Sequence, residues 1–145
     1  MSIRRLDHYN IAAPLAMIEA LRSFYCEVLG FEPGLRPPSS SFDYWLYAGG
    51  QALLHLRALD EDGVKASSTA LDSGWFNHIA IACSNVADWR RRLDALAISY
   101  RVERIVSLGQ LQLFLRDPAG VSIELNFIDP AAASTENPSD DAVAN

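Results

Sequence analysis

The chain has 145 residues, of which 50% are hydrophobic and 21% charged, a composition that suits one globular domain with a substantial core. Its formal net charge is −6, but residues 129–145 hold four acidic residues and no Lys or Arg, so the rest of the chain carries only −2. A body without a basic excess argues against nucleic acid or an anionic membrane as a partner, and no apolar run reaches the roughly 18 residues of a membrane span. We therefore expect a cytoplasmic protein with reduced cysteines.

The first half of the chain predicts a strand, a helix and two or three further strands. Residues 3–13 are typical of a strand that ends at Pro14, and residues 15–29 place apolar side chains at helical spacing before Gly30. After a loop rich in Pro and Ser, residues 42–58 contain two strand-like runs that meet at Gly49 and Gly50, which is a hairpin signal.

The second half repeats this order of elements after a polar linker at about residues 59–74. FNHIAIACS (76–84) predicts a strand, residues 85–97 predict a helix with Asn85 as its cap, and a strand follows near residues 99–106. Residues 111–127 form a second hairpin around Asp117, Pro118 and Gly120. We expect one α+β domain over residues 1–128, and residues 129–145 read as a disordered acidic tail.

Each half carries one ligand-type residue on its first strand and one on its last. His8 and His78 are 70 residues apart, and His55 and Glu124 are 69 apart. Read with a period of two, each shares a strand face with mostly small or polar neighbours, while bulky aliphatic residues gather on the opposite face. Singly, each has an ordinary alternative: His8 could cap a strand end, His55 could pack on an aromatic ring, His78 could be a core histidine and Glu124 could pair with an arginine.

Taken together, these four residues predict a metal site. A buried carboxylate beside three imidazoles is costly unless a cation pairs with them. Imidazole nitrogen and carboxylate oxygen suit Zn, Ni, Co, Fe(II) or Mn, and four protein ligands leave positions open for a substrate, which implies catalysis. We therefore predict one divalent ion bound by His8, His55, His78 and Glu124. The sequence leaves open whether one chain or two subunits complete the site.

Other residues on the same faces, and on the neighbouring strands, are candidate contacts for a small-molecule substrate. They are Asn10, Trp45, Tyr47, Arg57, Phe76, Gln112, Phe114, Arg116, Ser122 and Asn126. For Trp45, Tyr47 and Phe114, core packing is an equal alternative. An inward Arg57 or Arg116 would suit a carboxylate or another anion on the substrate.

Five segments carry a resemblance to a known family: LDHYNIA (6–12), SFYCEVLGFEP (23–33), ALLHL (52–56), FNHIAIA (76–82) and RDPAGVSIELNF (116–127). With them the chain resembles the vicinal oxygen chelate superfamily, which includes glyoxalase I, extradiol dioxygenases, methylmalonyl-CoA epimerase and the fosfomycin- and bleomycin-resistance proteins. The resemblance implies two βαβββ modules, about residues 3–58 and 75–128, that form a cup-shaped mixed β-sheet with helices outside. It also implies one metal at the four ligand positions, and a homodimer is expected.

His55 departs from the family pattern, since glyoxalase I enzymes usually carry Glu there and methylmalonyl-CoA epimerases Gln. His8, His78 and Glu124 alone would reproduce the two-His, one-carboxylate set of extradiol dioxygenases and fosfomycin-resistance enzymes. The resemblance implies a glyoxalase-like lyase or isomerase that acts on a small oxygenated substrate through a metal-stabilised enediolate-type anion, with Glu124 or His55 moving the proton. The alternatives are an Fe(II) extradiol dioxygenase and, disfavoured by the complete ligand set, a metal-free drug-binding resistance protein.

Overall fold

The structure, a computed structural model, describes residues 2–38, 42–60, 62–64 and 75–128. The chain divides into two compact units: Met1–Asn77 with Arg116–Val121, and His78–Leu115 with Ser122–Asn145. The predicted disordered tail, residues 129–145, and most of the predicted linker lie outside the described residues.

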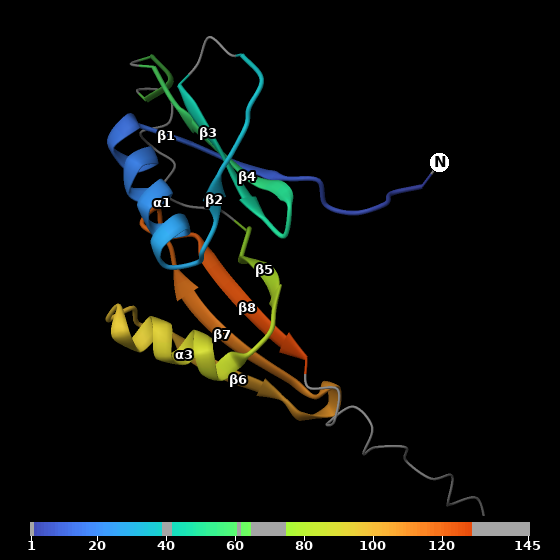
Figure 1. The fold of residues 1–145 in the computed structure, drawn as a ribbon. Coiled ribbons are helices and arrows are strands. Elements are labelled where there is room, and N and C mark those ends of the chain that lie inside the picture. Colours follow the sequence, from blue (N-terminus) through green and yellow to red (C-terminus); the bar gives the residue numbers. More distant parts are fainter. Residues whose placement is uncertain (1, 39–41, 61, 65–74, 129–145) are drawn as a thin grey trace, which may run out of the picture. The chain divides into compact units, whose positions relative to one another are not determined.

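Unit 1 contains a four-stranded mixed sheet and one long helix (Figure 1). Its elements are β1 (Tyr9–Ala13), α1 (Leu15–Glu27), β2 (Glu32–Pro33), β3 (Asp43–Ala48) and β4 (Gln51–Ala58). The strands lie in the order β1-β4-β3-β2, with β1 parallel to β4 and the other neighbours antiparallel. The predicted hairpin is confirmed: Ala48 lies opposite Gln51, and Gly49 and Gly50 between them both have positive φ, as a two-residue turn requires.

The first strand is shorter than predicted, because it begins at Tyr9 rather than at residue 3. Its ladder with β4 starts where Tyr9 lies opposite Leu54. Before that point, the side-chain amide of Gln51 donates to the backbone carbonyls of Leu6 and Asp7, so these carbonyls are satisfied without a strand partner. His8 therefore lies just outside the strand on which it was predicted.

The core of unit 1 lies between α1 and its sheet. Ile18, Leu21 and Tyr25 recur at helical spacing and are fully buried, as are Leu54 and Leu56 on β4. Because side chains alternate along a strand, burying Leu54 and Leu56 beneath the helix turns His55 to the other face of the sheet. Gly30, with φ of +74°, lets the chain reverse after the helix.

The turn at residues 116–121 belongs to unit 1 and ties a distant part of the sequence to the helix. Asp117 accepts a hydrogen bond from the Val121 backbone N–H at 2.8 Å through Oδ1, and Gly120 has a φ of +83°. The other carboxylate oxygen of Asp117 accepts the Tyr25 hydroxyl at 3.0 Å. The predicted turn around Asp117, Pro118 and Gly120 is confirmed.

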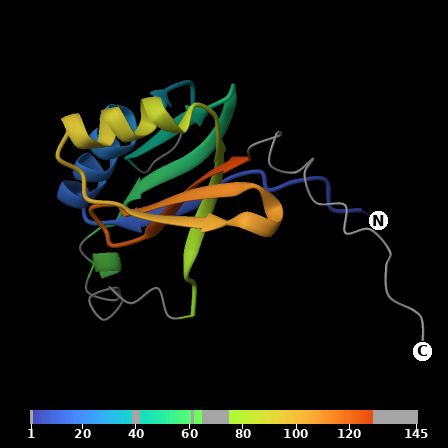
Figure 2. The ribbon, with the colours of Figure 1, turned by 90° about the horizontal axis from the view of Figure 1, so that it is seen from below.

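Unit 2 contains the second four-stranded sheet, with strand order β5-β8-β7-β6. Its elements are β5 (His78–Cys83), α3 (Val86–Ala95), β6 (Arg101–Ile105), a 3-10 turn at Val106–Leu108, β7 (Gln110–Arg116) and β8 (Ser122–Ile128). Helix α3 runs along this sheet in both ribbon views (Figures 1 and 2), and the buried side chains include Leu93, Leu113, Ile123 and Leu125.

Asn85 stands at the start of α3 as predicted, but its side chain forms no capping hydrogen bond. Its backbone is left-handed, with φ of 57°, a conformation that Asn tolerates better than most residues. The predicted capping role of its side chain is therefore wrong.

The two sheets repeat one register. In the parallel β1–β4 pair Asn10 lies opposite His55, and in the parallel β5–β8 pair Ala80 lies opposite Glu124. Asn10 and Ala80 each lie two residues after a predicted histidine ligand, His8 or His78. The α+β class and the repeated modules are thus confirmed, down to the alignment of the candidate ligand positions.

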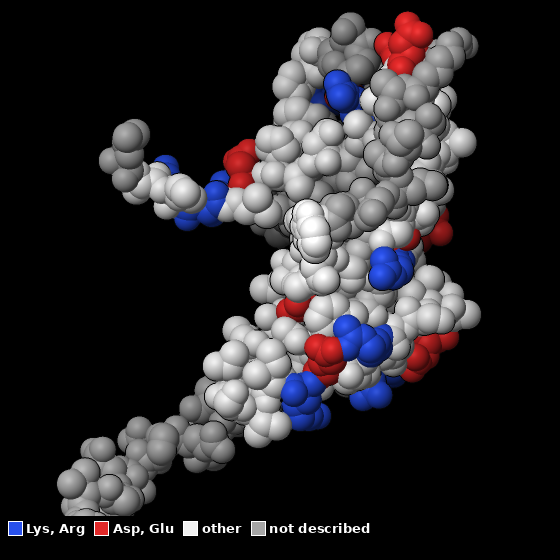
Figure 3. All heavy atoms as spheres, turned by 180° about the vertical axis from the view of Figure 1, so that it is seen from behind, with Lys and Arg blue, Asp and Glu red and all other residues white. Residues whose placement is uncertain are grey.

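Among the described residues, no helix is long and apolar enough to cross a membrane. On the face shown in Figure 3, the Arg side chains, drawn blue, lie among Asp and Glu side chains rather than in one basic area. The ion pairs of unit 2 include Arg91 with Asp88, 2.6 Å apart, and Arg101 with Glu103.

Candidate metal centre

His78 and Glu124 form a close pair in unit 2. His78 is the first residue of β5 and Glu124 lies on the neighbouring strand β8. His78 Nε2 lies 2.9 Å from Glu124 Oε2. Glu124 is only 5% exposed, and its other oxygen accepts a 2.6 Å hydrogen bond from Gln112 Nε2. Both oxygens of this buried carboxylate therefore have a partner.

The spacing of this pair fits two ligands of one metal ion. Nitrogen and oxygen ligands lie about 2.1 Å from a first-row divalent ion, so two ligands at right angles are about 3.0 Å apart. The 2.9 Å between His78 Nε2 and Glu124 Oε2 is a hydrogen-bond distance for the ion pair itself and is also close to that separation. The donor set, one imidazole and one carboxylate, suits Zn, Fe(II), Mn, Co or Ni.

Unit 1 holds the other two predicted ligands in an aromatic stack. The His55 ring on β4 lies between the His8 ring and the Trp45 indole, with centroids 4.0 Å away on each side and interplanar angles of 17° and 7°. His8 Nδ1 lies 2.8 Å from Asp7 Oδ2, which leaves His8 Nε2 as the nitrogen available to a metal. Asp7 was missed by the sequence reasoning, although a carboxylate beside a ligand histidine is a common support.

The stack limits what these two histidines can do together. The lone pair of an imidazole nitrogen lies in the ring plane, so a metal ion lies close to the plane of each imidazole that binds it. Two nearly parallel rings 4.0 Å apart cannot both point a lone pair at one ion. As arranged, unit 1 can therefore offer one imidazole ligand, and using both would require one ring to rotate.

The surroundings of His55 favour its neutral form. Burial lowers the pKa of His55 below its ordinary value, and the neighbouring His8 lowers the pKa further. A hydrogen bond to the backbone of Ala52 acts in the opposite direction and engages one ring nitrogen. A neutral imidazole can accept a proton or bind a metal, so both roles predicted for His55 need this form.

Within the described ranges, no group of three or more His, Cys, Asp or Glu side chains lies close enough together to hold a metal ion. The four predicted ligands occur as two pairs, one in each unit.

Several of the predicted substrate contacts lie beside these pairs. Trp45 stacks on His55, and Asn10 lies opposite His55 in the strand register. Ser122 lies opposite His78, and the Phe114 ring meets the His78 ring edge-on with centroids 5.7 Å apart.

The rest of the predicted contacts have other surroundings. Arg57 on β4 and Phe76 are exposed, and Arg116 donates to the Gly120 carbonyl at 2.7 Å. Asn126 has a buried Oδ1 that meets no hydrogen-bond donor among the described residues, which leaves an acceptor for a ligand or water. Arg101, which the sequence reasoning missed, holds its guanidinium 4.7 Å from the centre of the Phe114 ring.

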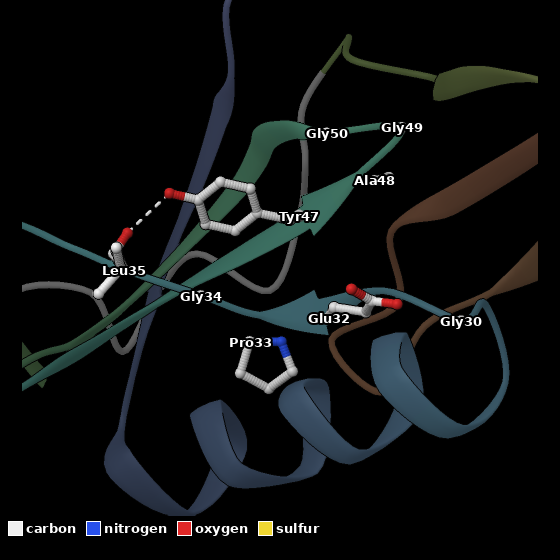
Figure 4. A pocket seen from close by; sticks show the side chains of 9 residues that line it. All are labelled: Gly30, Glu32, Pro33, Gly34, Leu35, Tyr47, Ala48, Gly49 and Gly50. Atoms are coloured by element: carbon white, nitrogen blue, oxygen red, sulfur yellow. Dashed lines mark hydrogen bonds between the residues drawn. The ribbon is translucent and has the colours of Figure 1, made fainter.

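Tyr47 lines a pocket of about 410 Å³ in unit 1 (Figure 4). Its hydroxyl donates to the Leu35 carbonyl at 2.7 Å, and its ring lies so close to Gly34 that a Cβ there would collide with it. Apart from Tyr47, Glu32, Pro33 and Leu35, the lining residues are Ala48 and four glycines, including the turn residues Gly49 and Gly50. The lining includes none of the four predicted ligands.

Comparison with known proteins identifies the relatives of this chain. The family profile described as Glyoxalase/Bleomycin resistance protein/Dioxygenase superfamily matches residues 5–125. The chain is 30% identical over 129 residues to the Arabidopsis thaliana protein named Glyoxylase I 4, which covers 86% of this chain and 71% of that protein.

Solved structures share its fold. Lactoylglutathione lyase from Agrobacterium tumefaciens aligns with a TM-score of 0.59 and 23% identity, over 88% of this chain and 96% of that one. A variant of a fosfomycin resistance protein from Listeria monocytogenes, in complex with Mn(II) and 1S,2S-dihydroxypropylphosphonic acid, aligns with a TM-score of 0.66 and 16% identity, over 93% and 100% of the two chains. At these identities the similarity shows the fold.

Proposed function

Because the chain belongs to the glyoxalase/bleomycin resistance protein/dioxygenase superfamily, we propose that it is a divalent-metal-dependent enzyme, a glyoxalase-like lyase or isomerase that acts on a small oxygenated substrate. The observation that carries the proposal is the His78–Glu124 pair, in which Glu124 is buried and the 2.9 Å spacing suits two neighbouring ligands of one ion. The name of one relative, Glyoxylase I 4, supports the reaction class.

In this proposal His8, His78 and Glu124 hold the ion, with His8 binding through Nε2. A divalent cation bound there supplies Lewis-acid stabilisation of the negative charge that develops when a proton leaves a carbon next to a carbonyl group. Asp7 keeps His8 oriented through Nδ1. The buried carboxylate of Glu124 contributes the negative charge that compensates the ion.

We assign the proton transfer to His55. Its ring stacks against that of His8, so the two rings as arranged do not converge on one ion. The hydrogen bond to the Ala52 backbone makes one nitrogen the N–H donor and leaves the lone pair on the other, which can accept a proton from a substrate carbon. The Trp45 indole holds the plane of the imidazole from the other side.

The polar residues near the two pairs would then bind the substrate. Asn126 offers a buried acceptor without a donor among the described residues, and Ser122 and Asn10 lie in register with His78 and His55. Of the two arginines proposed to bind a substrate anion, Arg57 is the stronger candidate, because Arg116 donates to Gly120. We also propose that the protein is a cytoplasmic homodimer.

The ligand set of this proposal also fits a second candidate, an Fe(II) extradiol dioxygenase. Because the His8–His55 stack as arranged offers one imidazole to an ion, His8, His78 and Glu124 make a set of two histidines and one carboxylate. This set, with open positions, is typical of non-haem Fe(II) oxygenases.

The identity of the bound metal and oxygen consumption separate the two candidates. Protein purified without added metal should contain zinc, nickel, cobalt or manganese, and it should consume no oxygen when catechol is added in an oxygen electrode. Stoichiometric iron together with catechol-dependent oxygen uptake would replace the lyase or isomerase by the dioxygenase. A protein that retains no divalent metal after reconstitution would refute both candidates.

A further inference from the structure

Gln112 is the buried neighbour of the proposed carboxylate ligand. It lies on β7, the strand next to β8 in the sheet of unit 2, and is 8% exposed. Its Nε2 donates to Glu124 Oε1 at 2.6 Å, in a bond that is itself buried. A buried carboxylate without donors would cost several kcal/mol, so this bond offsets part of the cost of placing Glu124 in the interior.

The chemistry of the donor matters for a cation site. A Lys or Arg in this place would neutralise the carboxylate and compete with a metal ion for it. The amide of Gln112 is neutral, so it satisfies one oxygen and leaves the full negative charge on Glu124. Hydrogen bonds to a charged acceptor are short and strong, as the 2.6 Å separation indicates.

The two carboxylate oxygens of Glu124 have different partners. Oε1 accepts from Gln112, while Oε2 lies 2.9 Å from Nε2 of His78. With Oε1 held by the amide, the carboxylate plane is fixed and Oε2 is the oxygen turned toward the second ligand. A similar arrangement supports His55 in unit 1, where the strand next to it supplies the Trp45 ring, a flat partner suited to a flat imidazole.

We infer that Gln112 is a positioning residue that holds Glu124 through Oε1 and presents Oε2 to the metal as a single oxygen ligand. This inference rests on the proposed metal-dependent function. It gives Gln112 a role through Glu124, in place of the direct substrate contact predicted from the sequence.

The test is a titration of the metal-free, full-length protein with Co²⁺, followed by visible absorption, which reports both affinity and coordination geometry. Gln112→Met keeps the length of the side chain and removes the donor, and Gln112→Asn keeps the amide but is too short to reach Oε1. Both variants are expected to bind Co²⁺ about 10- to 100-fold more weakly than the wild type, the usual cost of losing a partner of a ligand. Their absorption bands should also change.

The matched control is Gln110→Met, which makes the same substitution on the same strand. It should keep the wild-type Co²⁺ affinity and spectrum. Circular dichroism of each variant checks the fold, and the two Gln112 variants fill the site differently, so a packing defect in one does not decide the result.

Three results would overturn the inference, and only the last of them also overturns the proposed function. If the wild type binds Co²⁺ and both Gln112 variants keep its affinity and spectrum, Gln112 does not position Glu124 and the proposed function stands. An unchanged spectrum with only a lower thermal stability would assign Gln112 to packing alone, with the same consequence. If the wild type itself binds no Co²⁺, the proposed function fails first and the inference falls with it.

Discussion

Tyr25→Phe removes one hydroxyl from the interior of unit 1. Tyr25 is fully buried on α1, and its hydroxyl donates to Asp117 Oδ2 at 3.0 Å, where Asp117 is 5% exposed. A hydrogen bond to a charged group contributes about 1.5–3 kcal/mol. We expect the free energy of unfolding to fall by about 2 kcal/mol at pH 7, and the melting temperature to fall by about 4–8 °C for a chain of this size.

The loss should depend on pH, with a sign that follows from Asp117. Burial raises the pKa of Asp117 above its ordinary value of 3.8, and the hydrogen bonds from Val121 and Tyr25 lower the pKa. Asp117 therefore has a higher pKa in the folded than in the unfolded state. Ionisation of Asp117 destabilises the fold, and this cost appears as the pH rises from the unfolded-state pKa through the folded-state pKa. Removing the Tyr25 hydroxyl raises the pKa of Asp117 further, so the deficit should be largest at neutral pH and should shrink once Asp117 is protonated.

Urea denaturation of the wild type and the variant at pH 7 and near pH 4 measures this difference. The control is Tyr100→Phe, which removes a hydroxyl that accepts a 3.4 Å hydrogen bond from Arg90 Nε at the surface. That variant should stay within about 0.5 kcal/mol of the wild type. A Tyr25→Phe deficit below about 0.5 kcal/mol at pH 7, or one that grows as the pH falls, would refute the reasoning.

Substitutions at three further positions test packing and backbone strain in the two units by urea denaturation. Gly34→Ala places a methyl group against the Tyr47 ring and should destabilise the protein by about 1–3 kcal/mol. This loss of stability should largely disappear in a Tyr47→Ala background. An equal loss in both backgrounds would show that the methyl group does not collide with the ring. Asn85 has a left-handed backbone and no capping bond, so Asn85→Gly should preserve stability while Asn85→Val should lose about 1–2 kcal/mol; equal effects would exclude backbone strain. Ile123→Ala leaves a cavity in the buried core of unit 2 and should lower the free energy of unfolding by about 2–5 kcal/mol. A decrease below about 1 kcal/mol would contradict this prediction.

The sequence predicts the repeat well because strand geometry is local. Side chains alternate along every strand, so the apolar pattern was enough to predict that the candidate ligands lie on the face opposite the bulky aliphatic side chains. Those that the structure buries include Leu54, Leu56, Ile123 and Leu125. The spacings of 70 and 69 residues between the halves predicted the repeat of ligand-type positions, and the structure adds the shared register of β1–β4 and β5–β8.

The details of the site could not be predicted in the same way. The stacking of His8 on His55 depends on side-chain torsions and on the start of β1 at Tyr9, where hydrogen bonds from Gln51 end the ladder. The role of Gln112 beside Glu124 depends on which side chains of adjacent strands meet, and a pattern of alternation leaves that choice open.

The contact of Tyr25 with Asp117 spans 92 positions in the sequence, and no local pattern indicates it. The turn at residues 116–121, which carries Asp117, belongs to unit 1 together with α1. Long-range pairs of this kind are found only once the fold is known.

The most direct test of the central claim is calorimetric titration of the metal-free protein with Zn²⁺. We predict one site per chain in the wild type, loss of that site in His78→Ala and in Glu124→Ala, and an unchanged site in Glu103→Ala, which removes a carboxylate paired with Arg101 at the surface. Absence of a stoichiometric site in the wild type, or an unchanged site in Glu124→Ala, would contradict the account.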